Sequence, residues 1–175
     1  MKNYFSAMIL AAGFGKRMMP LTNDLPKPLL QINGITLLDN SINILKNLGC
    51  NNIVINTHYM YEKIYDHINR RKDNLNIDLI YESAILDTGG AIKNALNLFK
   101  NKDLIIINSD IFWTYENIID FKNLITEYNI SKNPHLLLVN KNNANGLNKI
   151  NGDFILDKNK VKRFKQNDPI FFYSG

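Results

Sequence analysis

The sequence predicts an α/β fold of three layers, with a mainly parallel sheet, helices on both of its faces and a short β-only tail at the carboxyl end. One observation is an alternation up to residue 140, where short apolar runs are separated by segments whose apolar residues recur at helical spacing. The other is a change after residue 150, where the helical spacing stops and short strand-like runs follow turn-forming residues. The 175 residues suffice for one domain with a real core.

The expected strands of the parallel sheet are apolar runs rich in Ile, Leu and Val, as is typical of strands covered on both faces. They lie at residues 6–10, 52–56, 78–81, 104–108 and 135–139. The expected helices have apolar residues three and four positions apart, and they lie at residues 37–48, 61–68, 92–99 and 118–128. In the tail, strands are expected at residues 153–156, 160–164 and 170–173.

The composition excludes several classes of protein. An apolar fraction of 45% and a charged fraction of 21% argue against disorder, collagen and a disulfide scaffold. The single Cys50, the lack of a signal-peptide core and the lack of a long apolar run predict a cytoplasmic protein with no membrane partner. The net charge of +5 fits an anionic partner, but the basic stretch at residues 158–165 is more typical of a solvated face, so no nucleic-acid partner is expected.

In an open parallel sheet, ligands bind outside the carboxyl ends of the strands. The loops that begin at residues 11, 57, 83 and 109 should therefore converge on one cleft. The first of them is rich in small residues, and its sequence at residues 10–18 is LAAGFGKRM. Such a loop lets the backbone approach a ligand and its amides cradle phosphate oxygens, although a tight turn is an equally good interpretation of this loop alone. It lacks the third glycine of the dinucleotide fingerprint and the spacing of a Walker A loop.

A second segment, LPKPLL at residues 25–30, places Lys27 between two prolines. Each proline fixes its own φ and restricts the residue before it, so the Lys27 ammonium group would be presented at a fixed point. On its own, the segment is better interpreted as a rigid surface turn with a solvated lysine.

Together these segments closely resemble the sugar-1-phosphate nucleotidylyltransferase family. The shared pattern is Gly-x-Gly-x-Arg-Met-x-Pro-Leu-Thr followed by Pro-Lys-Pro-Leu, after a strand that ends in Leu-Ala-Ala-Gly. Similar segments continue downstream as NTHY at residues 56–59, LDTGGA at residues 86–91 and NSD at residues 108–110. The nearest subgroups are the N-acetylmuramate-1-phosphate uridylyltransferases and the mannose-1-phosphate guanylyltransferase-like proteins. The resemblance implies a Rossmann-like nucleotidyltransferase fold in a single domain, with a nucleotide-binding core at residues 1–140 and an incomplete, β-rich sugar-side segment at residues 141–175.

The resemblance also assigns roles to residues. Arg17, whose guanidinium group suits phosphate oxygens, would grip the β- and γ-phosphates, and Lys27 would serve the α-phosphate and the sugar phosphate; these are the expected catalytic residues. Asp110 would hold Mg²⁺, the expected cofactor, although a loop aspartate that caps the next segment is the alternative. The expected nucleotide-binding residues are Leu10, Ala11, Ala12, Gly13, Gly15, Arg17, Lys27 and Gly90.

By resemblance, the chain couples a nucleoside triphosphate, with UTP favoured, to a sugar 1-phosphate by Mg-assisted in-line attack on the α-phosphorus, and releases pyrophosphate. The same chemistry with GTP and mannose 1-phosphate, or with CTP and an alcohol phosphate, stays open. A truncated, non-catalytic nucleotide-binding remnant is a further alternative. It arises because family members continue beyond this chain and carry a second metal-binding aspartate there, which a separate chain could supply.

Other residues near the expected cleft favour structural roles. Asp87 suits the N-cap of a helix, His58 suits a structural hydrogen bond, and Cys50 suits a small core position. Trp113 and Phe112 could either wall a sugar pocket or pack in the core.

Overall fold

A computed structural model of the chain describes residues 5–101, 103–143, 153–158, 160–163 and 171–173. The structure separates into two units, Met1–Ile118 and Ile119–Gly175. The division into a nucleotide-binding core and a sugar-side segment stays a prediction. Among the described residues, no helix is both long and apolar enough to cross a membrane.

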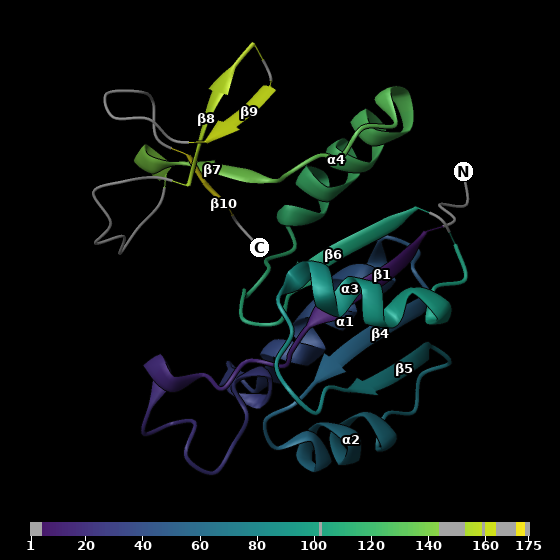
Figure 1. Cartoon of the computed structure of the whole chain (residues 1–175), viewed down its shortest axis with the longest axis vertical. Coiled ribbons are helices and arrows are strands. Elements are labelled where there is room, and N and C mark those ends of the chain that lie inside the picture. Colours follow the sequence, from purple (N-terminus) through teal and green to yellow (C-terminus); the bar gives the residue numbers. More distant parts are fainter. Residues whose placement is uncertain (1–4, 102, 144–152, 159, 164–170, 174–175) are drawn as a thin grey trace. The chain divides into compact units, whose positions relative to one another are not determined.

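The first unit is built on a parallel sheet with the strand order β5-β4-β1-β6 (Figure 1). Its strands are β1 (Ser6–Leu10), β4 (Asn52–Thr57), β5 (Asn76–Tyr81) and β6 (Leu104–Asn108). Every pairing between neighbours is parallel, which confirms the predicted sheet. In this register Leu10, the last residue of β1, lies opposite both Asn56 and Asn108. The carboxyl ends of three neighbouring strands therefore meet at one edge.

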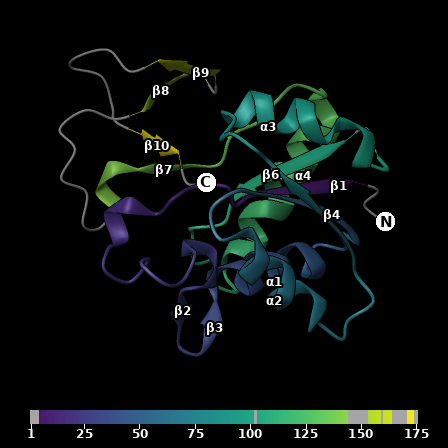
Figure 2. The same ribbon diagram turned by 60° about the horizontal axis from the view of Figure 1, so that its bottom comes forward.

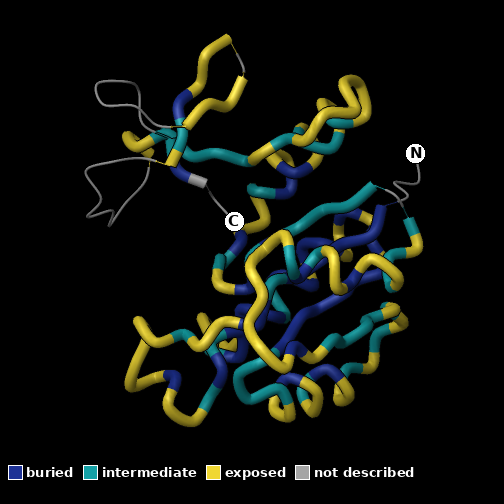
Figure 3. Tube along the Cα trace, in the orientation of Figure 1, coloured by how far each residue is buried: buried dark blue, intermediate teal, exposed yellow. Residues whose placement is uncertain are grey.

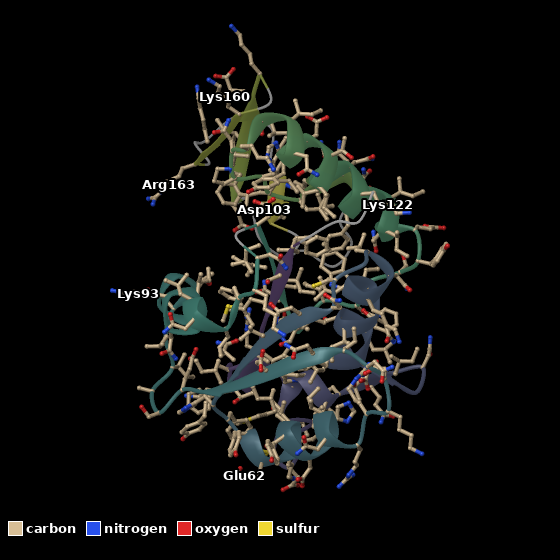
Figure 4. All side chains as sticks on the ribbon, turned by 90° about the vertical axis from the view of Figure 1, so that its right-hand side faces the viewer. Glu62, Lys93, Asp103, Lys122, Lys160 and Arg163 are labelled. Atoms are coloured by element: carbon tan, nitrogen blue, oxygen red, sulfur yellow. The ribbon has the colours of Figure 1, made fainter. Side chains whose placement is uncertain are left out.

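Helices cover both faces of this sheet, so the expected three layers are confirmed. The helix α3 (Thr88–Ala95) lies on one face, and α1 (Leu37–Asn47) and α2 (Tyr61–Asn69) lie on the other (Figure 2). A short 3₁₀ turn, Leu96–Leu98, follows α3 and occupies most of what was expected to be the end of that helix. Glu62 on α2 and Lys93 on α3 are exposed on the outer surfaces of their helices (Figure 4).

The core forms because the central strands are apolar on both faces. Met8 and Val54 are fully buried with Ala91 and Ala95 of α3, and alternation along β1 turns Ala7 and Ile9 to the opposite face. The dark-blue trace along β1 and β4 in Figure 3 shows this buried centre. Full burial of a side chain such as Met or Val contributes about 1.5–3 kcal/mol.

A short hairpin precedes α1 and was not expected from the sequence. It pairs β2 (Gln31–Ile32) with β3 (Ile35–Thr36) across the turn residues Asn33 and Gly34, both of which have positive φ. An Asn-Gly pair between apolar residues is a strong hairpin signal because both residues tolerate the left-handed conformation. Thr36 then caps α1, since its side chain accepts a hydrogen bond from the backbone of Asp39 at 2.9 Å.

The second unit combines a helix with an antiparallel sheet. Its elements are α4 (Asn117–Ser131), which starts just before the boundary, and the strands β7 (Leu138–Asn140), β8 (Phe154–Asp157), β9 (Lys160–Arg163) and β10 (Phe171–Tyr173). A 3₁₀ turn, Lys141–Asn143, follows β7. The strand order is β7-β10-β8-β9, which confirms the β-only tail; residues 164 and 170, at the ends of two expected strands, lie outside the described residues.

One expected strand belongs to a different sheet. The run at residues 135–139 was assigned to the parallel sheet, but β7 begins at Leu138 and pairs antiparallel with β10. The reason is the partner strand, because Val139 lies opposite Phe172, whose side chain is buried. A hydrophobic run alone does not determine which sheet a strand joins.

Candidate functional site

The candidate site lies at the carboxyl edge of the parallel sheet, where β1 and β6 end side by side. The backbone amide of Ser109 donates to the carbonyl oxygen of Leu10 at 3.1 Å, and this bond holds the loops after β1 and β6 together. A pocket of about 190 Å³ opens there. Its lining residues are Leu10, Ala11, Gly13, Lys27, Pro28, Asn108, Ser109 and Asp110. Two of the expected loops, those after residues 11 and 109, thus form one pocket.

The pocket brings the expected lysine and the expected metal ligand into contact. The Lys27 Nζ lies 2.5 Å from the Asp110 Oδ2, and the two side chains are only 22% and 35% exposed. Lys27 begins the 3₁₀ turn η2 (Lys27–Leu29), whose Pro28 and Leu29 are buried and anchor the segment. The position of Lys27 is therefore fixed by its neighbours, as the flanking prolines predicted.

Gly15 allows this segment to approach the loop after β1. It has a φ of 65°, which glycine adopts without strain, and a Cβ atom added to it would lie 3.0 Å from the Cβ of Lys27 and 3.1 Å from Thr22 Cγ2. The buried Thr22 closes the turn, since its hydroxyl donates to the Gly15 carbonyl oxygen at 3.1 Å. Gly13 differs, because a Cβ there would meet nothing within 4 Å. Of the Gly-x-Gly pair, Gly15 is therefore the one that packing requires.

Arg17 does not reach this pocket. It lies in the 3₁₀ turn η1 (Lys16–Met18), which has no buried residue, and it is exposed. Ala12, Gly15 and Gly90 likewise lie outside the lining of the pocket, although Gly15 packs directly behind Lys27. The structure therefore brings together Leu10, Ala11, Gly13, Lys27 and Asp110.

A buried polar chain crosses the same edge and was not expected from the sequence. The Ala11 amide donates to Asn56 Oδ1 at 2.9 Å, and Asn56 Nδ2 donates to Glu82 Oε1 at 2.9 Å. The other Glu82 oxygen, Oε2, accepts from the amide of Leu86 at 3.1 Å. Asn56 is 3% exposed and Glu82 is 2% exposed. The available signal was a polar residue at the end of one apolar strand and a carboxylate directly after another.

These hydrogen bonds of the buried polar chain determine which backbone groups of the loop stay available to a ligand. The Ala11 amide is used by Asn56, and the Leu10 carbonyl oxygen accepts from Ser109. Within the described residues, the amides of Ala12 and Gly13 make no hydrogen bond. Among the described residues, the amides of Ala12 and Gly13 are therefore the ones in this part of the loop that no protein group occupies.

Two residues have the structural roles that the sequence favoured. The Asp87 side chain caps α3, because its Oδ1 accepts from the Gly90 amide at 2.7 Å. A Cβ on Gly90 would lie 3.2 Å from Leu86 Cβ and 3.3 Å from Asp87 Oδ1, so glycine keeps this helix start compact. His58 Nδ1 lies 2.7 Å from the Glu82 carbonyl oxygen, which can only accept, so Nδ1 is the donor.

Cys50 and Trp113 are core residues. Burial raises the pKa of the Cys50 thiol to about 11, although a hydrogen bond to the backbone of Asn52 acts in the opposite direction. A thiol of this kind is inert at neutral pH. Trp113 is buried, and its backbone is held by Asn40, which accepts from the Trp113 amide at 2.7 Å and donates to its carbonyl oxygen at 2.9 Å.

A family model described as nucleotidyl transferase matches residues 6–165. The chain belongs to this family. The position of the pocket at the carboxyl edge of a parallel sheet agrees with ligand binding in such folds.

Curated relatives of the chain include proteins named as uridylyltransferases and proteins named as guanylyltransferases. The chain is 37% identical over 111 residues to the N-acetylmuramate alpha-1-phosphate uridylyltransferase of Caulobacter vibrioides, a match that covers 61% of this chain and 46% of the relative. It is 31% identical over 122 residues to the D-glycero-alpha-D-manno-heptose 1-phosphate guanylyltransferase of Aneurinibacillus thermoaerophilus, covering 66% and 53%. The chain thus spans about half the length of these relatives.

Solved structures show the same fold. HddC from Yersinia pseudotuberculosis complexed with GMP-PN aligns with a TM-score of 0.75 and 26% identity, covering 97% of this chain and 74% of that one. The CTP:phosphocholine cytidylyltransferase LicC from Streptococcus pneumoniae aligns with a TM-score of 0.51 and 29% identity, covering 63% and 47%.

The donor set at the pocket limits how a metal ion could be held. Within the described part of the chain, no group of three or more His, Cys, Asp or Glu side chains is placed to bind a metal. Asp110 offers one carboxylate to the pocket, and its Oδ2 atom is paired with the ammonium group of Lys27. This fits Mg²⁺, which keeps several waters and usually takes one or two carboxylates plus substrate phosphates. It does not fit a metal that requires a closed protein cage.

Proposed function

We propose that the chain transfers a nucleotidyl group from a nucleoside triphosphate, with UTP favoured, to a sugar 1-phosphate. The observation that carries the proposal is the meeting of Lys27 and Asp110 in one pocket at the carboxyl edge of the sheet. A fixed cation beside a carboxylate suits a reaction between two anionic substrates. Membership of the nucleotidyl transferase family and the names of the relatives support the same reaction class.

The reaction needs no general base. A phosphate monoester has its second pKa near 6, so a sugar 1-phosphate is largely a dianion at pH 7. One of its oxygens forms the new bond to the α-phosphorus, the bond from that phosphorus to the β-phosphate oxygen breaks, and pyrophosphate leaves with the electron pair. The remaining task for the protein is positioning and charge stabilisation.

In this mechanism each residue contributes charge or geometry. Lys27 would bind the α-phosphate and the sugar phosphate, and Gly13 would let the triphosphate approach the backbone. Asp110 would hold Mg²⁺, which supplies charge neutralisation on the phosphates when bound. Arg17 is exposed on η1, from which its long side chain would grip the β- and γ-phosphates.

A guanylyl transfer is the second candidate. It is supported by the likeness to HddC, whose structure is described as a complex with GMP-PN and which covers 97% of this chain. A cytidylyl transfer to an alcohol phosphate and a non-catalytic nucleotide-binding protein are the remaining alternatives.

The test is a pyrophosphate-release assay with UTP, GTP and CTP, each combined with Mg²⁺ and a set of sugar 1-phosphates. We expect turnover with UTP and at least one sugar 1-phosphate. Thermal shift with each triphosphate alone gives an independent measure, because a ligand that binds the folded state raises its melting temperature. Binding without turnover for every pair would contradict the catalytic proposal and leave a nucleotide-binding protein.

A further inference from the structure

The buried polar chain joins the loop after β1 to the loop after β5 through Asn56 of strand β4. Asn56, near the end of β4, links the loop after β1 to the side chain of Glu82, and Glu82 links in turn to the approach of α3. All three hydrogen bonds are 2.9–3.1 Å long. The spacing between residues 10–13 and residues 86–90 is therefore set by two side chains rather than by packing alone.

A link of this kind through a carboxylate carries the free-energy cost of burying a charged group. A charge buried as deeply as that of Glu82 is tolerated only when its oxygens are hydrogen-bonded, and here each oxygen accepts one bond. At the amino end of β4, the neutral pair of Ser6 and Asn52 also links neighbouring segments. There Asn52 Oδ1 accepts from the Ser6 hydroxyl at 2.6 Å and from the Lys100 amide at 3.1 Å. Joining strands therefore does not by itself require the carboxylate of Glu82.

We propose that Asn56 and Glu82 are positioning residues, which set the gap between the two backbone segments that hold the nucleoside of the triphosphate. This inference rests on the proposed function and adds residues to its site. Asn56 occupies the Ala11 amide, whereas the amides of Ala12 and Gly13 make no hydrogen bond within the described residues and can serve the ligand. Glu82 fixes Leu86, next to the cap that starts α3.

The width of this gap should control which base is accepted. Purine and pyrimidine bases differ in size, and a displacement of about 1 Å in a substrate-positioning group can reduce a rate about 100-fold. A satisfied buried network is stiff, whereas a network with one unsatisfied member is not. Loss of a hydrogen bond between Asn56 and its partners or between Glu82 and its partners should therefore lower triphosphate affinity. It should also reduce the discrimination between UTP and GTP.

A side-chain swap tests this inference. In Asn56→Asp the new carboxylate faces that of Glu82. In Glu82→Gln the new amide group either points its NH₂ at the NH₂ of Asn56 or points it at the Leu86 amide, which then loses its acceptor. The double variant Asn56→Asp with Glu82→Gln restores all three bonds, because the new aspartate accepts from Ala11 and from the new glutamine, whose oxygen accepts from Leu86. The swap also keeps the net charge.

The measurements are the Kd of UTP by calorimetry and the ratio of kcat/KM for UTP and GTP. Each single variant should weaken UTP binding and lower kcat/KM on the order of 10- to 100-fold, and the swap should return both to within about fivefold of wild type. The matched control is Asn52→Ala against Asn56→Ala. The two asparagines lie in one strand and are 2% and 3% exposed, so both changes should lower the Tm, but only Asn56→Ala should change the Kd and the UTP:GTP ratio.

The possible outcomes separate the two proposals. If the single variants lose Tm but keep the wild-type Kd and UTP:GTP ratio, or if a folded swap variant rescues neither, the positioning role is wrong. If Asn56→Asp does not fold, the near-isosteric Glu82→Gln decides by the same measurements. If wild type binds UTP without turnover, the proposed reaction fails while the Kd still judges the positioning role; if no triphosphate binds, both are wrong.

Discussion

The two ends of strand β4 carry the same residue type in different settings. Asn52 at the amino end and Asn56 near the carboxyl end are both buried, and each links β1 to a segment beyond the sheet. At the amino end the partner is the Ser6 hydroxyl, which also accepts from the Asn101 amide at 3.0 Å, so the link is neutral. At the carboxyl end the partner is the carboxylate of Glu82.

The difference follows from what lies beside each link. At the carboxyl edge the Lys27–Asp110 pocket opens and exposed Phe14 packs edge-on against His58, with ring centroids 5.3 Å apart. At the amino edge the Asn52 Oδ1 atom and the Ser6 hydroxyl bind each other and the backbone amides of residues 100 and 101. Parallel sheets place their ligands at the carboxyl edge, so polar groups there should control activity, while those at the amino edge should control stability alone.

The largest expected effect at the carboxyl edge is that of Lys27→Ala. Loss of a positioned cation in a phosphate-transfer site should lower kcat about 10²–10³-fold. Stability should change little, because a partly exposed ion pair contributes about 0–1 kcal/mol. Pyrophosphate release and thermal melting measure the two effects, and Lys63→Ala, which removes an exposed lysine bonded to the Asp24 carbonyl oxygen, is the control. A large drop in Tm with turnover retained would mean that Lys27 is structural.

Gly15→Ala should affect both activity and stability. The left-handed conformation and the 3.0 Å approach to Lys27 Cβ should destabilise the fold by about 1–3 kcal/mol. Displacement of Lys27 should lower kcat about tenfold or more. Gly13→Ala is the matched change for stability, since its Cβ enters open space and the unfolding free energy should change by less than about 0.5 kcal/mol. Equal stability losses in urea titrations of the two variants would show that the contact with Lys27 does not constrain Gly15.

Ser6→Ala at the amino edge should lower stability and leave activity unchanged, which is the opposite of the effect expected for Lys27→Ala. It removes a donor to Asn52 and leaves the Asn101 amide without its acceptor, which should cost about 1–3 kcal/mol of unfolding free energy. The kcat and KM of the folded variant should match those of wild type at temperatures well below its Tm. A change in the KM for the triphosphate would mean that the two edges are coupled through β4.

Periodicity predicted most of the fold, because strands buried on both faces and amphipathic helices leave strong local patterns. The family resemblance assigned Lys27 and Asp110 to one site, and the structure brings the two side chains into contact, although their roles stay predictions. The link between Asn56 and Glu82 could not be predicted, because it depends on the register between strands; β4 and β5 pair so that Asn56 lies opposite Ile80, two residues before Glu82. For the same reason the sheet that β7 joins was assigned wrongly: its partner β10 lies far along the chain.

The smallest expected effect comes from an ion-pair cluster of Asp39, His67 and Arg71, which lies outside the lining of the Lys27–Asp110 pocket. Burial alone would raise the pKa of Asp39, but hydrogen bonds from His67 and Thr36 and the charges of His67 and Arg71 outweigh it and lower that pKa below 3.8. His67 Nε2 lies 2.8 Å from Asp39 Oδ2, and Arg71 also pairs with this carboxylate, which joins α1 to the end of α2.

A lowered carboxyl pKa stabilises the fold above the ordinary pKa, and this contribution is lost as the pH falls through the lowered value. Wild type should therefore lose stability progressively below about pH 4, and Asp39→Asn should be less stable at pH 7 but flatter across this acid range. Urea titrations from pH 7 to pH 2.5 measure this dependence. Asp157→Asn is the control, because the Asp157–Lys162 pair is about half exposed on each side and should contribute little. Since no residue of the cluster lines the Lys27–Asp110 pocket, Asp39→Asn should leave the Kd of UTP unchanged at pH 7; a weaker Kd would show that α1 and α2 help to shape the carboxyl edge.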